Sequence, residues 1–337
     1  MNQIERVERA LQRKKPDRIP FSFWTHMAGV DLDAEALADK TYEFCREYDL
    51  DFIKTMNNGM YSVEDYGCSL DQSQVAAGGV TKISSTPIQS VSDWSKIKTL
   101  SLNQGALRRE LRSLDFLVKK TKGRIPIVFT IMSPMTTAEK LSRGTVLQDL
   151  KAGREADILP ALEAITETTC RLAEEGIRRG AAGIFFASDM CFYGEKDEAF
   201  CEKYEKPFDL QILKAASGGW FNALHAHGDQ ILFSLLKDYP VQAFNWHVGE
   251  SLPDIDEAAD VLTGGLMGGL NRTDVTQGNR TALFHQIYRM LKETKGRGCL
   301  VTPGCVVRRP YAPETIHFIR KALSQLEQQM IVQEESV

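Results

Sequence analysis

The sequence lacks several patterns that would place it in a familiar class of protein. Its seven cysteines are scattered, odd in number and never form a C-x-x-C pair, which indicates reduced thiols in a cytoplasm. With 41 basic and 45 acidic residues the net charge is −4, so no overall basic surface suggests a nucleic-acid partner. The charged N-terminal segment has no apolar core of a signal peptide, and no run approaches the ~18 apolar residues of a membrane span.

What the chain does have is an alternation of short β-rich runs and longer segments with helical periodicity. This alternation predicts parallel strands joined by crossover helices. About eight such units favour an α/β fold of the (β/α)8 TIM-barrel type, as a single domain over residues 1–337. The absence of a G-x-G-x-x-G motif after the early strands weakens the alternative of an open doubly wound sheet. The expected strands are Ile19–Phe23, Phe52–Thr55, Ile125–Thr130, Gly183–Ala187, Trp220–Leu224, Val241–Trp246, Gly265–Gly269 and Gly298–Thr302, and the expected helices are Leu32–Glu47, Ile158–Arg179, Glu202–Ala216, Asp229–Asp238, Ile255–Leu262, Thr281–Thr294 and Pro313–Gln329.

One segment, Tyr61–Lys96, breaks this alternation. It is polar, contains glycine and has short alternating runs such as VTKISSTPIQ. We expect it to form a small hairpin insertion after the second strand, in a place where it can cover the mouth of the barrel.

Polar side chains recur at the carboxyl ends of the expected strands, where the loops of such a barrel assemble active sites. Four of the six histidines lie at these ends. The clustering predicts that the chain is an enzyme. The residues concerned are Trp24, His26, Lys54, Ser133, Ser188, Asp189, His225, His227, Asn245, His247, Asn271, Arg272 and Cys305.

Three of these residues, His225, His227 and Cys305, have side chains that commonly bind zinc. His225 and His227 lie two residues apart in the stretch LHAHGD, so a strand directs both imidazoles to one face. Cys305 ends the stretch LVTPGC after the last expected strand. Three such ligands with an open fourth position are typical of catalytic zinc. The structural alternative is a satisfied core histidine beside a buried cysteine, and His247 competes with Cys305 as third ligand.

The remaining candidates are assigned to catalysis or to substrate binding. Lys54 is predicted to bind an anionic group, with a pairing to Asp51 as the alternative. His26 is predicted to contact the substrate. Asp189 is predicted to act as a general base or to orient a ligand, and an equally good interpretation makes it a helix cap. The residues expected to line the substrate site are Trp24, Ser133, Asn245, His247 and Arg272.

The chain resembles the uroporphyrinogen decarboxylase superfamily over nearly its whole length. The resemblance rests on ERVERALQRKKPDRIPFSFW, YDLDFIKTM, FTIMSPMTTAEKL, GIFFASDM, EKYEKPFDLQILKAA, LHAHGD, GGLNR and TPGCVV. Proteins of this superfamily are (β/α)8 barrels, so the resemblance implies the same fold as the alternation does.

The resemblance distinguishes two branches with different chemistry. True decarboxylases carry an M-R-Q-A-G-R type loop and an aspartate after the second strand, and they act on a tetrapyrrole without a cofactor. Here the matching positions hold WTHMAGVD, with His26 and no arginine, and Lys54. A substrate with many carboxylates and a cationic intermediate needs clustered arginines and a carboxylate. Both are missing, so the chain is nearer the methylcobamide:coenzyme M methyltransferase branch.

In that branch a His-x-Cys pair and a distant cysteine hold zinc, which activates a thiol to attack a cobalt-bound methyl group. His225 and Cys305 match the first and last ligands, whereas His227 stands where the branch has cysteine. One thiolate and two neutral imidazoles leave a zinc site at about +1, whereas two thiolates and one imidazole leave it neutral. The more positive site depresses the pKa of a bound thiol further than the neutral site does. The resulting thiolate is more abundant and less nucleophilic.

The resemblance therefore implies Zn2+ as cofactor, a thiol-type acceptor and a corrinoid as methyl donor. The chain has no D-x-H-x-x-G cobalamin motif, so the corrinoid is expected on a partner protein. Two alternatives remain: a metal-independent decarboxylase of a tetrapyrrole or a smaller acid, and a barrel that binds a tetrapyrrole or corrinoid without turnover. The decarboxylase branch also implies a homodimer as a candidate assembly.

Overall fold

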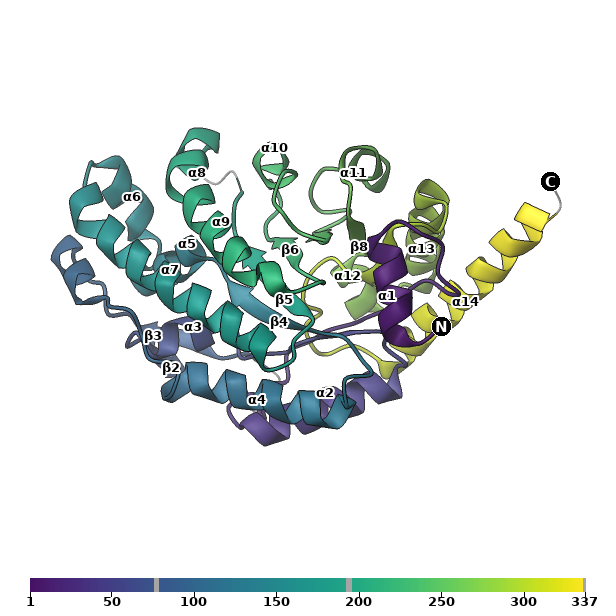
Figure 1. The fold of residues 1–337 in the computed structure, drawn as a ribbon, viewed down its shortest axis with the longest axis horizontal. Coiled ribbons are helices and arrows are strands. Elements are labelled where there is room, and N and C mark those ends of the chain that lie inside the picture. The colour runs from purple at the N-terminus through teal and green to yellow at the C-terminus, as the bar shows by residue number, and fades with distance from the viewer. Residues whose placement is uncertain (76–78, 192–195, 336–337) are drawn as a thin grey trace.

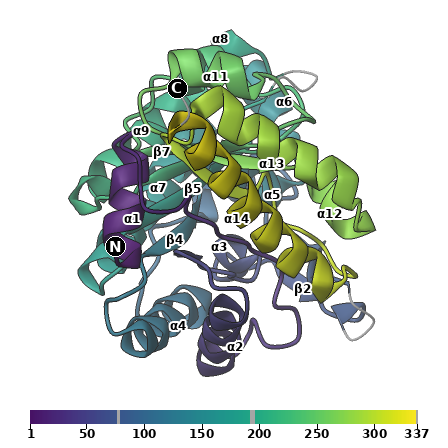
Figure 2. The same ribbon diagram turned by 90° about the vertical axis from the view of Figure 1, so that its right-hand side faces the viewer.

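The computed structural model describes residues 1–75, 79–191 and 196–335. Helices surround a central group of strands, with the N-terminal helix α1 and the C-terminal helix α14 on one side of the molecule (Figures 1 and 2). None of the helices in these ranges is long and apolar enough to cross a membrane. The helices are α1 (Gln3–Leu11), α2 (Ala34–Glu47), α3 (Tyr61–Glu64), η2 (Val91–Lys96), α4 (Gly105–Thr121), α5 (Pro134–Ser142), α6 (Thr145–Lys151), α7 (Glu155–Arg178), α8 (Glu198–Tyr204), α9 (Lys206–Ala215), η3 (Ala216–Gly218), α10 (Phe233–Leu236), α11 (Ile255–Val261), α12 (Arg272–Gln277), α13 (Arg280–Thr294) and α14 (Pro313–Glu335).

The main sheet is parallel, and its strands follow one another in sequence order. Its seven strands are arranged β1-β4-β5-β6-β7-β8-β9, and each pair of neighbours is parallel. This curled sheet with helices outside it is consistent with a TIM-like fold, so the α/β class predicted from the alternation is confirmed. The strands are β1 (Ile53–Lys54), β4 (Ile127–Met132), β5 (Gly183–Ser188), β6 (Ala223–Ala226), β7 (Ala243–Trp246), β8 (Gly265–Leu270) and β9 (Cys299–Pro303).

The first predicted strand, Ile19–Phe23, is not a regular strand. It forms an isolated parallel bridge between Phe21 and Val301 of β9. On its other side the amide of Asp51 donates to the carbonyl of Phe21, at 2.8 Å. Pro20 has no amide hydrogen and so cannot donate to a neighbouring strand. The amide of Phe21 donates to the Asp51 carboxylate, at 2.9 Å, and not to a strand. The amide donors that a continuous strand pairing needs are therefore absent or already bonded. The segment nevertheless contacts both β9 and Asp51.

Two predicted helices are shorter or divided. The segment Asp229–Asp238 is helical only over α10, because Ile231 bridges to Cys191 before it and proline follows Tyr239 after it. The helix expected over Glu202–Ala216 is broken into α8 and α9 at Glu205, where Pro207 begins the second helix in its first turn.

The segment Tyr61–Lys96 contains α3, η2 and two short strands. Strands β2 (Ser69–Asp71) and β3 (Lys82–Ser85) pair antiparallel, separately from the main sheet. Asn58, four residues beyond β1, donates its amide to Thr81 at 3.0 Å and to Asp31 at 3.0 Å. The bond to Thr81 connects the residue before β3 to the loop that follows β1.

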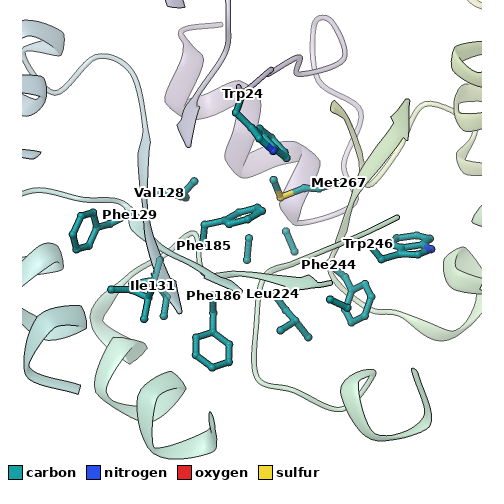
Figure 3. Packing of buried hydrophobic residues seen from close by; sticks show 14 of the residues in the cluster. Trp24, Val128, Phe129, Ile131, Phe185, Phe186, Leu224, Phe244, Trp246 and Met267 are labelled. Atoms are coloured by element: carbon teal, nitrogen blue, oxygen red, sulfur yellow. The ribbon is translucent and has the colours of Figure 1, made fainter. Parts of the chain in front are cut away.

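The core shows the alternation expected of strands that are buried on both faces. Phe185 and Phe186 are consecutive residues of β5 and are both buried, yet they lie on opposite sides of the strand (Figure 3). Phe129 of β4 packs against α7, where a Cβ at Gly176 would come within 2.7 Å of its ring. The outward side chains hold the helices, and the inward ones, including Phe185, fill the concave side of the sheet.

Candidate metal centre

Four side chains that can bind a metal converge at the carboxyl ends of the strands. They are His225, His227, His247 and Cys305, and one ligand atom from each lies within 4.8 Å of all the others. His225 is the third residue of β6, His227 follows that strand, His247 follows β7 and Cys305 follows β9. His225, His247 and Cys305 are buried and His227 is partly exposed. The structure thus brings together three residues predicted as ligands and adds His247, which was predicted to bind substrate or, as an alternative, to replace Cys305 as the third ligand.

The positions of the two histidines of LHAHGD follow from the strand. The amide of His227 donates to the carbonyl of Ser188 at 2.9 Å, so the pairing of β6 with β5 continues past the assigned end of the strand. Residues two apart in an extended segment point to the same face. The ring centroids of His225 and His227 are 5.7 Å apart as a result.

Two separations among the donor atoms match the edges of a tetrahedral zinc site. With Zn–N of about 2.0–2.1 Å and Zn–S of about 2.3 Å, tetrahedral edges are about 3.3 Å between nitrogens and about 3.6 Å between nitrogen and sulfur. His247 Nε2 lies 3.2 Å from His227 Nδ1. Cys305 Sγ lies 3.6 Å from the same His227 nitrogen. The imidazole and thiol donors and these two separations fit zinc, and the four donor atoms lie within 4.8 Å of one another.

Hydrogen bonds determine which nitrogen His225 can offer. Its Nδ1 lies 2.6 Å from Asn245 Oδ1, so Nε2 is the nitrogen available to the cluster. Its ring stacks on Phe185, with centroids 5.2 Å apart and planes 22° from parallel. The ring is thus held both at its edge and on its face.

The electrostatics of the cluster favour a thiolate. Burial raises the pKa of the Cys305 thiol, but hydrogen bonds with His225, His227 and His247 outweigh this and bring that pKa well below its usual value. Burial lowers the pKa of His225, whereas the hydrogen bond to Cys305 raises the pKa of His227. The thiolate is the form of cysteine that binds metals.

Lys54, at the end of β1, is a buried cation near this cluster. Its side chain is 7% exposed and its Nζ lies 5.3 Å from the centroid of the Phe185 ring. Burial lowers the pKa of Lys54 to about 8, an effect opposed by the charge of Cys305. Among the described residues no carboxylate forms an ion pair with it, so the pairing with Asp51 that was the alternative interpretation is absent; Asp51 binds Arg6 and Arg18 instead.

His26 lies among several cations, which include Lys54, Arg308 and Lys140. Burial first, and then the charges of Lys54 and Arg308, lower the pKa of His26 to about 4. Its imidazole is therefore neutral near pH 7. A cavity of about 570 Å3 opens beside it, with a lining that includes Lys40, Lys82, Arg308 and Arg309. The cavity beside His26 is thus rich in positive charge.

Several residues predicted to bind substrate are occupied by structural contacts. Trp24 is 1% exposed and packs edge-on against Phe185, with centroids 5.4 Å apart (Figure 3). Ser133 caps α5, where its Oγ accepts from the amide of Thr136 at 3.1 Å. Arg272 donates to Glu250 at 2.9 Å.

Asn245 and Asp189 also differ from their predicted surroundings. Asn245 is fully buried and both groups of its amide are engaged, one of them by His225. Asp189 does not cap a helix, because Asp197 caps α8. The charge of Asp189 instead contributes to the raised pKa of His227, after the hydrogen bond to Cys305 and the opposing effect of burial.

Sequence reasoning missed two cations that lie close enough to His26 to affect its pKa, Lys140 and Arg308. Lys140 lies on α5 and donates to the carbonyl of Gly59 at 3.2 Å. Both cations act on the pKa of His26, behind burial and Lys54. Arg308 lies three residues after Cys305, and that proximity is a signal in the sequence. Lys140 lies on a helix with no polar pattern that distinguishes it.

Comparisons with known proteins agree with this architecture. A family model described as "Uroporphyrinogen decarboxylase (URO-D)" matches residues 2–326. The methylcobamide:CoM methyltransferase MtbA of Methanosarcina acetivorans is 24% identical over 228 residues, which cover 63% of this chain and 65% of that relative.

Solved structures show the same fold at lower identity. A methyltransferase from Methanosarcina mazei superposes with a TM-score of 0.83 at 16% identity, covering 97% of this chain and 99% of the other. A B12-independent methionine synthase from Shewanella sp. W3-18-1 gives a TM-score of 0.59 at 12% identity, with 96% of each chain covered. Since the family model spans nearly the whole sequence, the chain belongs to the uroporphyrinogen decarboxylase (URO-D) family.

Proposed function

We propose that this chain is a zinc-dependent methyltransferase that moves a methyl group from a corrinoid to a thiol acceptor. The observation that carries the proposal is the convergence of His225, His227, His247 and Cys305, whose donor atoms lie within 4.8 Å of one another. A zinc ion bound there would supply the positive charge that keeps an acceptor thiol deprotonated near neutral pH.

The metal ligands in this proposal are His225, His227 and Cys305, and the acceptor takes the remaining position. His247, whose Nε2 lies 3.2 Å from His227 Nδ1, would help to hold the ion in the absence of an acceptor. Its Nδ1 is 3.8 Å from Glu250 Oε2, so a carboxylate is at hand for the ring once its Nε2 is released. In this proposal the segment Ile19–Phe23, which contacts both β9 and Asp51, takes the place of the missing strand of a (β/α)8 barrel.

The acceptor in this proposal carries an anionic group. Lys54 offers a buried ammonium with no carboxylate partner among the described residues, and such a group binds an anion more strongly than a solvated one does. Asp189, near His227, accepts the proton that the thiol loses. Arg272, which is held by Glu250, contributes to the charge balance and does not contact the acceptor.

Similarity to a methylcobamide:CoM methyltransferase supports a corrinoid as the donor. In the transfer the thiolate sulfur forms a bond to the methyl carbon as the cobalt–carbon bond breaks. The electron pair of that bond stays on cobalt, so the corrinoid leaves as Co(I). Without a cobalamin motif in the chain, the donor is delivered by a partner protein or as free methylcobalamin.

Metal-independent decarboxylation fits the site less well. His26 would be the proton donor in such a reaction, next to Lys54 as the cation that binds the carboxylate. The pKa of His26 is lowered to about 4, chiefly by burial, so near pH 7 the ring is a neutral imidazole and a poor proton donor. Its neutral imidazole is better suited to accept a hydrogen bond from the acceptor.

The test is a methyl-transfer assay with methylcobalamin and a panel of thiols that carry or lack an anionic group. We expect loss of the methylcobalamin spectrum and formation of the thioether, both abolished by chelator and restored by zinc. Cys305→Ser should also abolish them. Carbon dioxide release that persists in chelator would support the decarboxylase instead. A corrinoid spectral change without turnover, unaffected by Cys305→Ser, would support a binding barrel.

A further inference from the structure

A single buried amide, that of Asn245, connects His225 to the strand that leads to Cys305. Asn245 is the third residue of β7 and is fully buried. One of its terminal atoms faces His225 Nδ1 at 2.6 Å. The other faces the carbonyl oxygen of Met267 in β8, at 2.8 Å, and that of Pro303 in β9, at 3.2 Å.

The two carbonyl groups determine the orientation of the amide. A carbonyl oxygen only accepts hydrogen bonds, so the atom that faces Met267 and Pro303 must be the NH2 group of Asn245. A flipped amide would place its oxygen against two other oxygens in a buried site, where unpaired polar atoms are costly. The atom that faces His225 is therefore the amide oxygen.

This orientation in turn determines the tautomer of His225. The amide oxygen of Asn245 only accepts, so the 2.6 Å contact requires a proton on His225 Nδ1. In the neutral ring the lone pair is then on Nε2, the nitrogen that would bind a metal; a second proton on Nε2, which a hydrogen bond to the Cys305 thiolate requires when no metal is bound, leaves the Nδ1–H bond to Asn245 in place. Stacking on Phe185 keeps the plane of the ring fixed at the same time.

We propose that Asn245 is a positioning residue that holds His225 as the Nδ1–H tautomer and aims Nε2 at the metal position. The inference rests on the proposed function in that Nε2 has a metal to bind. It goes beyond that function because it assigns the ligand geometry to a residue that does not contact metal or substrate. Partners of this kind contribute about 10–100-fold to metal affinity.

The type of residue at position 245 follows from the same contacts. An aspartate would accept from His225 but could not donate to Met267 and Pro303, and a leucine could do neither. Asparagine does both, and it brings no net charge next to the metal position. Pro303 is two residues before Cys305, so the bond to its carbonyl also fixes the base of the loop that presents the thiol.

Asn222 provides a matched control. It is also a buried asparagine, 2% exposed, and its NH2 group donates to the carbonyls of Ala216 and Gly219 at 2.9 and 3.2 Å. Its oxygen accepts from the amide of Ile184 at 3.0 Å instead of from a histidine. Asn222→Leu therefore removes a similar set of buried hydrogen bonds, whose partners are not metal ligands, directly before the strand that carries His225.

The experiment has two readouts, neither of which depends on activity. The first is the tautomer of His225 in metal-free protein with nitrogen-15-labelled histidine, assigned with a His225→Gln variant. We expect the Nδ1–H form in the wild type and in Asn245→Asp, and loss of that preference in Asn245→Leu. The second is the Kd for zinc, expected to rise about 10–100-fold in Asn245→Leu, to rise less in Asn245→Asp and to stay unchanged in Asn222→Leu.

Two results would overturn the proposal: an Nε2–H tautomer in the wild type, or the same zinc affinity in Asn245→Leu as in the wild type. If Asn245→Leu does not fold, the wild-type tautomer and the Asn245→Asp variant still decide the question. Failure of the proposed function appears separately, because a protein that turns over no thiol can still show the expected tautomer and zinc affinity.

Discussion

Lys54 is costly to bury and well placed to bind an anion. Its side chain is 7% exposed and its ammonium faces the ring of Phe185. The pKa lowered by burial to about 8 means that the charged form is destabilised in the folded protein. Buried charges of this kind are common where a ligand of opposite charge binds. Replacing Lys54 by an apolar residue should therefore increase the stability of the fold and weaken anion binding.

We expect Lys54→Met to weaken binding of an anionic acceptor, with a KM about 10–100-fold higher, since hydrogen bonds to charged groups contribute about 1.5–3 kcal/mol. In the wild type the KM should rise as the pH passes above 8, where Lys54 loses its proton. Steady-state kinetics between pH 6 and about 9 test both statements. As a control, Lys237→Met removes an exposed ammonium and should leave the KM as it is. A KM that is insensitive to both changes would exclude Lys54 as the anion site.

The same variant should make the protein more stable near neutral pH. The folded pKa of Lys54 lies below its unfolded value, so the unfolded chain binds more protons between about pH 8 and 10.5, and wild-type stability rises with pH in that range. At pH 7 we expect Lys54→Met to raise the free energy of unfolding by about 1–3 kcal/mol, a gain that shrinks as the pH increases. Urea unfolding at pH 7 and pH 10 measures this difference.

At the scale of elements, the site depends on how closely the loops after β7 and β9 approach. Gly304 lies between Pro303 and Cys305, and its amide donates to the carbonyl of Leu270 at 3.0 Å. A Cβ at this position would lie 2.6 Å from the carbonyl oxygen of Trp246 and 3.2 Å from the Cα of His247. Both neighbours are backbone atoms of the β7 loop. The contact between His247 and Cys305 therefore requires glycine here.

We expect Gly304→Ala to separate the two loops and to weaken zinc binding at least about tenfold, as other losses of support around a metal ligand do. The matched control is Gly123→Ala: Gly123 has a φ of +66°, and a Cβ added there would meet no heavy atom within 4 Å. It should lose about 1 kcal/mol of stability from backbone strain and keep its zinc affinity. Titration with a chromophoric chelator compares the two. Equal zinc affinities in the two variants would show that zinc binding does not depend on the close approach of the loops after β7 and β9.

At the scale of the whole molecule, the sequence is informative where local periodicity decides the outcome. Alternation of strands and helices predicted the parallel sheet, and a period of two placed His225 and His227 on one face. The sequence was uninformative where side chains that are far apart in the chain compete for the same hydrogen-bond partner. Arg272 is bound by Glu250, and the amide of Phe21 is taken by Asp51, and neither pairing is visible in the spacing of residues.

The convergence of His247 with the other ligands depends on a loop rather than on a strand. His247 follows the last residue of β7, and the path of the chain there is set by contacts with Gly304 and Glu250. The sequence therefore placed it at the correct end of the sheet but could not place its ring. The same holds for Asn245. Strand periodicity predicts the face on which its side chain lies, but it does not predict that His225 is its hydrogen-bond partner.

The most direct test of the proposed metal centre is the metal content of protein purified without chelators, measured by elemental analysis for the wild type and for His225→Ala. We predict about one equivalent of zinc in the wild type, as expected for a single site with this donor set, and a large loss in the variant. Metal well below one equivalent in the wild type, unchanged by His225→Ala, would contradict this prediction.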